Sequence, residues 1–210
     1  MKINTLNQQK VLPVSLSSLK KIVRATLAFK KVTCREVSVY LVRKETIQQI
    51  HRRFFEDPSP TDCISFPCDP PSTPPCLFLG EVFACPEIAV EYAKKHRLDP
   101  YLELTLYIVH GLLHLIGFDD KDKKSRLQMQ REEKSCLHFL RKNGLLLEVV
   151  AKLHDSEKSM ILGHLERQGY ALPNHADGGL PSRAGEEAGS QEGPKGRFCA
   201  LKSFATASLT

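Results

Sequence analysis

The chain has 210 residues, of which 41% are hydrophobic and 26% charged. This length and apolar content predict one globular domain with some chain left over. No apolar run approaches the ~18 residues that a membrane helix needs, and the start lacks the apolar stretch of a secretory signal. The formal net charge is +6, and residues 1–50 hold ten Lys and Arg against two Glu. Such a basic portion suits a phosphate-rich partner, although lysines on exposed helix faces are often only solvated.

The cysteines indicate free thiols. The chain has seven of them, and none stands in a CxxC pair, which excludes zinc-ribbon and thioredoxin-like sites. Because no secretory signal precedes them, reduced thiols in a reducing compartment are the simpler account. We therefore predict a cytoplasmic protein without membrane association.

Short apolar runs and helical patterns alternate along residues 1–145. Apolar/polar alternation between turn formers predicts strands, and apolar residues at i, i+3 and i+4 predict helices. The predicted strands cover residues 2–6, 36–42, 63–66 and 77–85. The predicted helices cover residues 19–29 (capped by Ser15 or Ser17), 45–55, 86–97, about 100–116, and 123–142. We expect an α+β fold, a small mixed sheet of about four strands packed with helices, in which the helix from Pro100 is central.

Two details of these elements bear on function, and a third concerns the apolar side of helix 123–142. The Pro-rich segment 67–75 must be a loop, since Pro cannot donate to a ladder, and it is either the rim of a site or a plain connection. Glu81 lies within an apolar strand, where a carboxylate is costly unless paired; a role beside a site is weighed against a paired structural carboxylate, which is favoured. The apolar residues of helix 123–142 are Leu127, Met129, Cys136, Leu137 and Leu140.

Beyond residue 145 the pattern weakens. Residues 146–170 are compatible with one C-terminal helix. Residues 171–210 contain six of the twelve glycines and few large apolar side chains. Such a composition cannot bury enough apolar surface to offset chain entropy. We predict a folded domain over residues 1–145 and a disordered tail over residues 171–210.

The segment HGLLHLIGFDD, residues 110–120, carries the chemistry. His110 and His114 are four residues apart, so on a helix both imidazoles lie on one face and can reach one metal ion. Gly117 is a natural helix end, after which Asp120 can turn back toward the same ion. Two His and one Asp, with a fourth position open to water, are typical of catalytic rather than structural zinc. We predict one Zn²⁺ held by His110, His114 and Asp120.

The alternative reading of the two histidines is a pair of ordinary core side chains. It is weakened because two uncompensated imidazoles in an apolar helix would be costly. A zincin peptidase is also disfavoured: its motif has a general-base Glu directly after the first His, and this chain has Gly111 there. His51, His96 and His138 fit no ligand spacing and are expected at the surface.

Two stretches together resemble the signatures of the YbeY metalloendoribonucleases, bacterial rRNA maturation factors. HGLLHLIGFDD fits ten of the eleven positions of the family pattern H-G-x-L-H-L-x-G-Y/F-D-H, and Asp120 stands where the family has a third His. PTDCISFP, residues 60–67, is similar to the family's P-T-D-V-L-S-F-P, and Glu81 stands where the family strand has Asp. The resemblance covers about residues 1–145 and gives the tail no role.

The resemblance implies a function and a catalytic arginine. It implies cleavage of single-stranded RNA, in particular processing of the 3′ end of 16S rRNA during maturation of the small ribosomal subunit, with no DNA substrate. The family has an Arg before P-T-D, where ungapped alignment places Phe55 here. Arg52 and Arg53 are the nearest cations, and we assign the catalytic role to Arg52, three residues before Phe55.

Two other classes remain open from the sequence. One is a non-catalytic ribosome- or RNA-binding factor with structural zinc, which the open three-ligand set disfavours. The other is a metal-dependent hydrolase of a different substrate, peptides included, which the missing Glu at position 111 disfavours for the peptidase case. Metal removal and a substrate panel discriminate between them.

Overall fold

The computed structural model describes residues 1–71, 76–147 and 200–201. One mixed sheet forms the middle of the molecule, and its strands are β1 (Lys2–Asn7), β2 (Glu36–Leu41), β3 (Cys63–Pro67), β4 (Phe78–Ala84) and the two-residue β5 (Ala200–Leu201). The strand order is β1-β2-β4-β3-β5. Strand β2 is parallel to both β1 and β4, β3 is antiparallel to β4, and β5 is parallel to β3.

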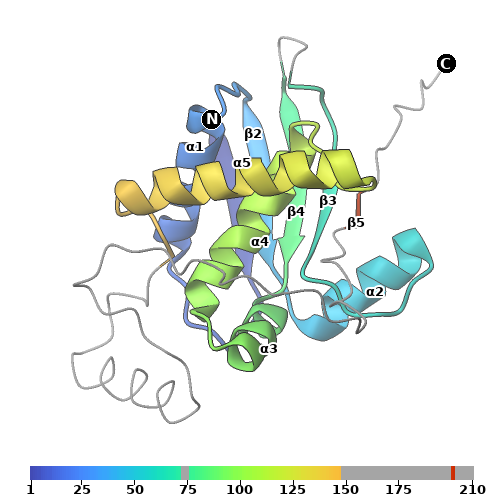
Figure 1. Cartoon of the computed structure of the whole chain (residues 1–210). Helices are drawn as coiled ribbons and strands as arrows, with labels where there is room; N and C mark the ends of the chain where they lie inside the picture. Colours follow the sequence, from blue (N-terminus) through green and yellow to red (C-terminus); the bar gives the residue numbers. More distant parts are fainter. Residues whose placement is uncertain (72–75, 148–199, 202–210) are drawn as a thin grey trace, which may run out of the picture.

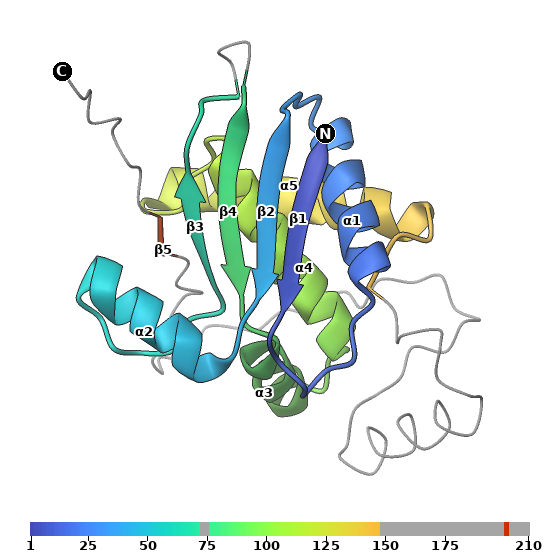
Figure 2. The same cartoon turned by 180° about the vertical axis from the view of Figure 1, so that it is seen from behind.

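The helices are α1 (Leu16–Phe29), α2 (Lys44–Phe55), α3 (Pro86–His96), α4 (Pro100–Leu115) and α5 (Lys123–Lys142). Helix α4 packs on one face of the sheet, and α1 and α5 lie on the same side (Figure 1). Helix α2 lies against the other face near β3, which is the face seen from behind in Figure 2. The predicted α+β fold, with about four strands and a central helix from Pro100, is confirmed.

Helix α4 is the core of the domain. Asp99 caps its first turn by accepting a hydrogen bond from the backbone N–H of Tyr101 at 2.8 Å, and Pro100 occupies the first turn, where a missing N–H costs nothing. All but one of its residues from Pro100 to Leu115 are buried. A helix that is apolar on every side must lie inside the protein, so its two histidines are held in a packed environment.

Gly111 explains how close α4 lies to the sheet. A β-carbon at this position would lie 2.5 Å from Cγ1 of Val82 on β4 and 3.1 Å from Oγ of Ser65 on β3. The hydroxyl of Ser65 donates a hydrogen bond to the carbonyl oxygen of Gly111 at 3.1 Å. The position that lacks the peptidase Glu is therefore a helix-to-sheet contact without room for a side chain.

One feature of α5 differs from the sequence prediction. Leu127, expected on the apolar side of α5, is 48% exposed, and the buried residues of that helix are Met129, Glu133, Cys136 and Leu140. Leu147 packs into the core, two residues beyond the predicted domain end at 145. The possible helix predicted over residues 146–170 lies outside the described residues from 148 onward, as does most of the predicted tail. Within that tail, Ala200 and Leu201 form β5.

Over the described residues, none of the helices has both the length and the apolar character needed to cross a membrane.

Candidate metal centre

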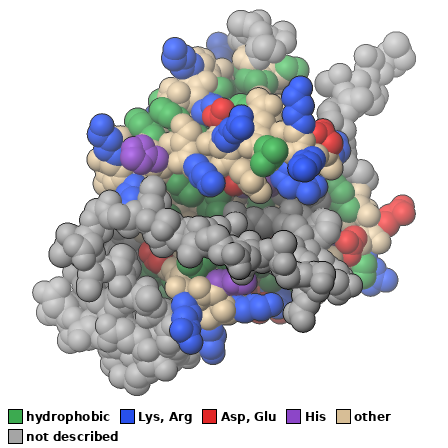
Figure 3. All heavy atoms as spheres, viewed as in Figure 1, with side chains coloured by type: hydrophobic (Ala, Val, Ile, Leu, Met, Phe, Trp, Pro, Cys, Tyr) green, Lys and Arg blue, Asp and Glu red, His purple; other side chains and the backbone are tan. Residues whose placement is uncertain are grey.

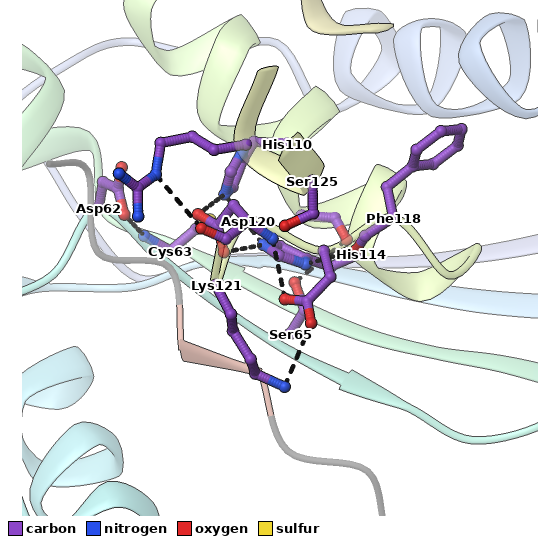
Figure 4. A network of polar contacts seen from close by, with 12 residues as sticks. Asp62, Cys63, Ser65, His110, His114, Phe118, Asp120, Lys121 and Ser125 are labelled. Carbon is purple, nitrogen blue, oxygen red and sulfur yellow. Dashed lines mark hydrogen bonds and ion pairs between the residues drawn. The ribbon is translucent and has the colours of Figure 1, made fainter. Parts of the chain in front are cut away.

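Helix α4 and the turn after it bring three predicted ligands together. His110 and His114 lie one turn apart on α4. The helix ends at Leu115, and Gly117 follows in the terminating turn, where its φ of +98° is a conformation that glycine adopts without strain. The backbone N–H of Phe118 then bonds to the carbonyl oxygen of Leu113 at 3.0 Å. This tight turn directs Asp120 back toward the histidines (Figure 4).

The three side chains converge on one point. Nε2 of His110 and Nε2 of His114 are 3.0 Å apart. One carboxylate oxygen of Asp120 lies 3.9 Å from His110 Nε2, and the other lies 3.9 Å from His114 Nε2. One ligand atom from each residue lies within 4.8 Å of the others. His110 and His114 are only 5% and 1% exposed, while Asp120 is partly exposed, so the cluster opens to solvent on the Asp120 side.

The outer ring nitrogens also have partners. Nδ1 of His110 lies 2.6 Å from Oε1 of Glu133, and Nδ1 of His114 lies 2.9 Å from the carbonyl oxygen of Phe118. Both acceptors favour a proton on Nδ1 and a lone pair on Nε2. Metal-binding histidines usually show this arrangement, in which the outer nitrogen donates to a carboxylate or carbonyl. Zinc bonds of about 2.0–2.1 Å would hold two tetrahedral ligands about 3.3 Å apart, close to the observed nitrogen separation, so the residues fit a zinc ion.

Asp119 has other polar partners. Its Oδ1 accepts a hydrogen bond from the backbone N–H of Asp120 at 2.8 Å, and its Oδ2 pairs with Lys121 at 3.3 Å. The Asp119 side chain is 38% exposed, against 17% for Asp120. Of the two adjacent acids, Asp120 is the one that joins the histidines.

The second sequence motif supports α4 rather than adding a ligand to the cluster. Thr61 and Asp62 are buried, and Oδ1 of Asp62 accepts hydrogen bonds from the Cys63 N–H at 2.7 Å and from the Thr61 hydroxyl at 3.3 Å. This fixes the entry to β3, from which Ser65 reaches α4. Figure 4 draws Asp62, Cys63 and Ser65 in the same region of polar contacts as His110 and His114.

Other predicted residues lie elsewhere. Arg52 is exposed in the last turn of α2. Glu81 accepts a hydrogen bond from the Tyr40 hydroxyl at 3.1 Å, as the structural interpretation requires. His96 and His138 are exposed as predicted, but the surface prediction for His51 is wrong: it is buried, and its Nδ1 lies 2.9 Å from the carbonyl oxygen of Ser59.

Sequence reasoning missed two residues at the site. Glu133 is buried and contacts His110; its spacing places it on the same side of α5 as Met129 and Cys136, but nothing in the sequence indicated that this side faces His110. Arg126 donates from Nε to the carbonyl oxygen of Asp120 at 3.3 Å, and its position six residues after Asp120 was the only signal. Cys136, three residues after Glu133, is also buried, and burial raises the pKa of its thiol to about 11.

Comparison with known proteins identifies the family of the domain. The family model for "Endoribonuclease YbeY" matches residues 4–141. The chain belongs to the YbeY endoribonuclease family. A YbeY relative from Protochlamydia amoebophila is 45% identical over 146 residues, which cover 70% of this chain and 97% of the relative. The YbeY endoribonuclease of Chlamydia felis is 37% identical over 152 residues, covering 70% of this chain and 96% of the relative.

Proposed function

We propose that this chain is a zinc-dependent endoribonuclease that cleaves single-stranded RNA and acts in rRNA processing, at the 3′ end of 16S rRNA. The endoribonuclease class follows from membership of the YbeY family. The observation that supports the zinc dependence is the convergence of His110, His114 and Asp120 within 4.8 Å, with both outer ring nitrogens already engaged. In this proposal the small ribosomal subunit is the partner and the cytoplasm is the location; the free thiols of the described cysteines suit a reducing compartment.

In this proposal each residue of the site has a distinct role in hydrolysis. His110 and His114 would hold the ion through Nε2, and Asp120 would bind it from the solvent side. A zinc ion in such a three-ligand site supplies Lewis-acid polarisation of a phosphoryl oxygen and acidifies a water. The buried side chains behind the histidines exclude water from that side, so the RNA phosphate approaches from the side of Asp120.

A phosphodiester also needs cationic help as negative charge develops on the phosphoryl oxygens. Arg126 is exposed and is held beside Asp120 by its hydrogen bond to the backbone. Further Lys and Arg side chains gather on the face formed by α5 (Figure 3). Its exposed basic residues include Lys123, Lys124, Arg131 and Lys134. We propose Arg126 as the nearer cation and retain Arg52 of α2 as the alternative.

Metal analysis combined with cleavage tests the proposal. Purified protein should contain one zinc per chain and cut an end-labelled single-stranded rRNA fragment internally, while leaving DNA of the same sequence intact. Chelation should abolish cleavage and zinc should restore it, because the ligands themselves supply no nucleophile. The His114→Ala variant, purified in parallel, controls for contaminating nucleases. If the zinc-loaded protein does not cleave RNA and chelation unfolds it, the zinc is structural. If the protein hydrolyses only other substrates, it is a different metal-dependent hydrolase.

Alanine variants decide between the two arginines. Arg126→Ala is expected to lower kcat/KM for RNA cleavage by roughly 100-fold, the scale of losing one donor to the developing charge, at unchanged zinc content. Lys124→Ala, an exposed cation of the same helix turn, is the matched control and should change it only a few-fold. A loss of this size in Arg52→Ala, with Arg126→Ala close to native, would assign the role to Arg52.

A further inference from the structure

Glu133 occupies a place where an apolar residue is expected. The buried side of α5 consists of Met129, Glu133, Cys136 and Leu140, and Glu133 is 6% exposed. A buried carboxylate is costly unless it is hydrogen-bonded or paired. We therefore expect the Glu133 carboxylate to have a hydrogen-bond or ion-pair partner on α4, the helix against which α5 packs.

The partner is the outer nitrogen of a predicted metal ligand. Oε1 of Glu133 lies 2.6 Å from Nδ1 of His110, a length typical of a charge-assisted hydrogen bond. The two histidines differ in this respect. His114 uses the carbonyl oxygen of Phe118, four residues away in its own turn, whereas His110 depends on a side chain 23 residues away on another helix.

We propose that Glu133 is a positioning residue that holds His110 in the tautomer with the proton on Nδ1, so that the lone pair of Nε2 points into the metal site. This inference rests on the proposed function, because it assigns a role toward the ion. Glu133 does not touch the ion or the RNA; it acts through His110. The packing of α5 on α4 thereby becomes a condition for zinc affinity, and the carboxylate makes His110 a stronger donor than an imidazole bonded to a neutral carbonyl.

Three variants test the proposal. Glu133→Leu removes the acceptor and fills the apolar stripe, so the fold should be kept; Glu133→Gln keeps an oxygen acceptor without the charge. The matched control is Glu132→Gln, which removes the same charge from the neighbouring position, where Glu132 pairs with Lys30 at 2.6 Å. Competition with a chromophoric chelator should show zinc affinity lowered 10- to 100-fold in Glu133→Leu, less in Glu133→Gln, and unchanged in Glu132→Gln.

A second readout uses no metal. Nitrogen-15 NMR of His110 in metal-free protein at pH 8 should show the proton on Nδ1 in the native chain and a shift toward the Nε2-protonated tautomer in Glu133→Leu. Unchanged tautomer and unchanged zinc affinity in that variant would overturn the inference, as would an equal loss of affinity in Glu132→Gln. If the native chain binds no zinc, the proposed function fails, while the tautomer measurement still decides the role of Glu133.

Discussion

Gly111→Leu is expected to give a protein without a cooperative unfolding transition, and Gly111→Ala is expected to lower the free energy of unfolding by about 1–3 kcal/mol. Overpacking of a core costs about this much, and the gain in helix propensity, about 1 kcal/mol, does not cancel the contact of a β-carbon 2.5 Å from Cγ1 of Val82. Leucine adds three more carbons against the same strand, and α4 then cannot lie on the sheet. Urea denaturation followed by circular dichroism measures both effects.

Val82→Ala provides the control for Gly111→Ala. It removes both methyl carbons of Val82 that lie within 3.2 Å of the added β-carbon, at the cost of a small cavity when made alone. The double variant should therefore be more stable than the sum of the two single losses predicts. Strict additivity would show that the contact between α4 and β4 does not restrict position 111.

Features set by local geometry could be predicted from the sequence. The spacing of His110 and His114 fixes their common face on any α-helix, and Gly117 ends that helix because few other residues adopt its conformation. The bounds of α5, predicted at 123 and 142 from its amphipathic pattern and the Asn143-Gly144 end, are confirmed, and in the structure Asp122 accepts two backbone hydrogen bonds at the start of the helix.

Features that depend on how helices and strands pack against one another could not be predicted from the sequence. The spacing of Met129, Glu133, Cys136 and Leu140 defines one side of α5, and Leu127 lies two residues before that series, about 200° around the helix from Met129. Only the docking of α5 on α4 decides which side is buried, and it buries an acid instead of a leucine. The contact of Glu133 with His110 follows from that docking, so the position of neither residue in the sequence predicts it. His51 was misplaced for the same reason, since its partner is a loop carbonyl at Ser59.

Asp120→Ala is expected to lower zinc affinity by at least about 100-fold and to abolish RNA cleavage. This loss of affinity exceeds the loss expected when a hydrogen-bond partner of a ligating histidine is removed. The carboxylate of Asp120 faces both Nε2 atoms at 3.9 Å and is the negative charge on the open side of the site. Zinc affinity measured by chelator competition and cleavage measured at saturating zinc separate weak binding from loss of catalysis.

The neighbouring acid and a histidine replacement complete this test. Asp119→Ala removes a side chain that pairs with Lys121 and should leave zinc affinity within a few-fold of native; loss of zinc in this variant, with Asp120→Ala unaffected, would move the third ligand to Asp119. Asp120→His should keep zinc, and the pH–rate profile of cleavage should rise at lower pH than in the native chain. An anionic ligand leaves a bound cation less net charge with which to acidify a water than a neutral imidazole does. Because a carboxylate is also the harder ligand, the native chain should retain more activity with Mn²⁺ than the variant, and equal pH profiles and metal preferences would show that residue 120 does not contact the ion.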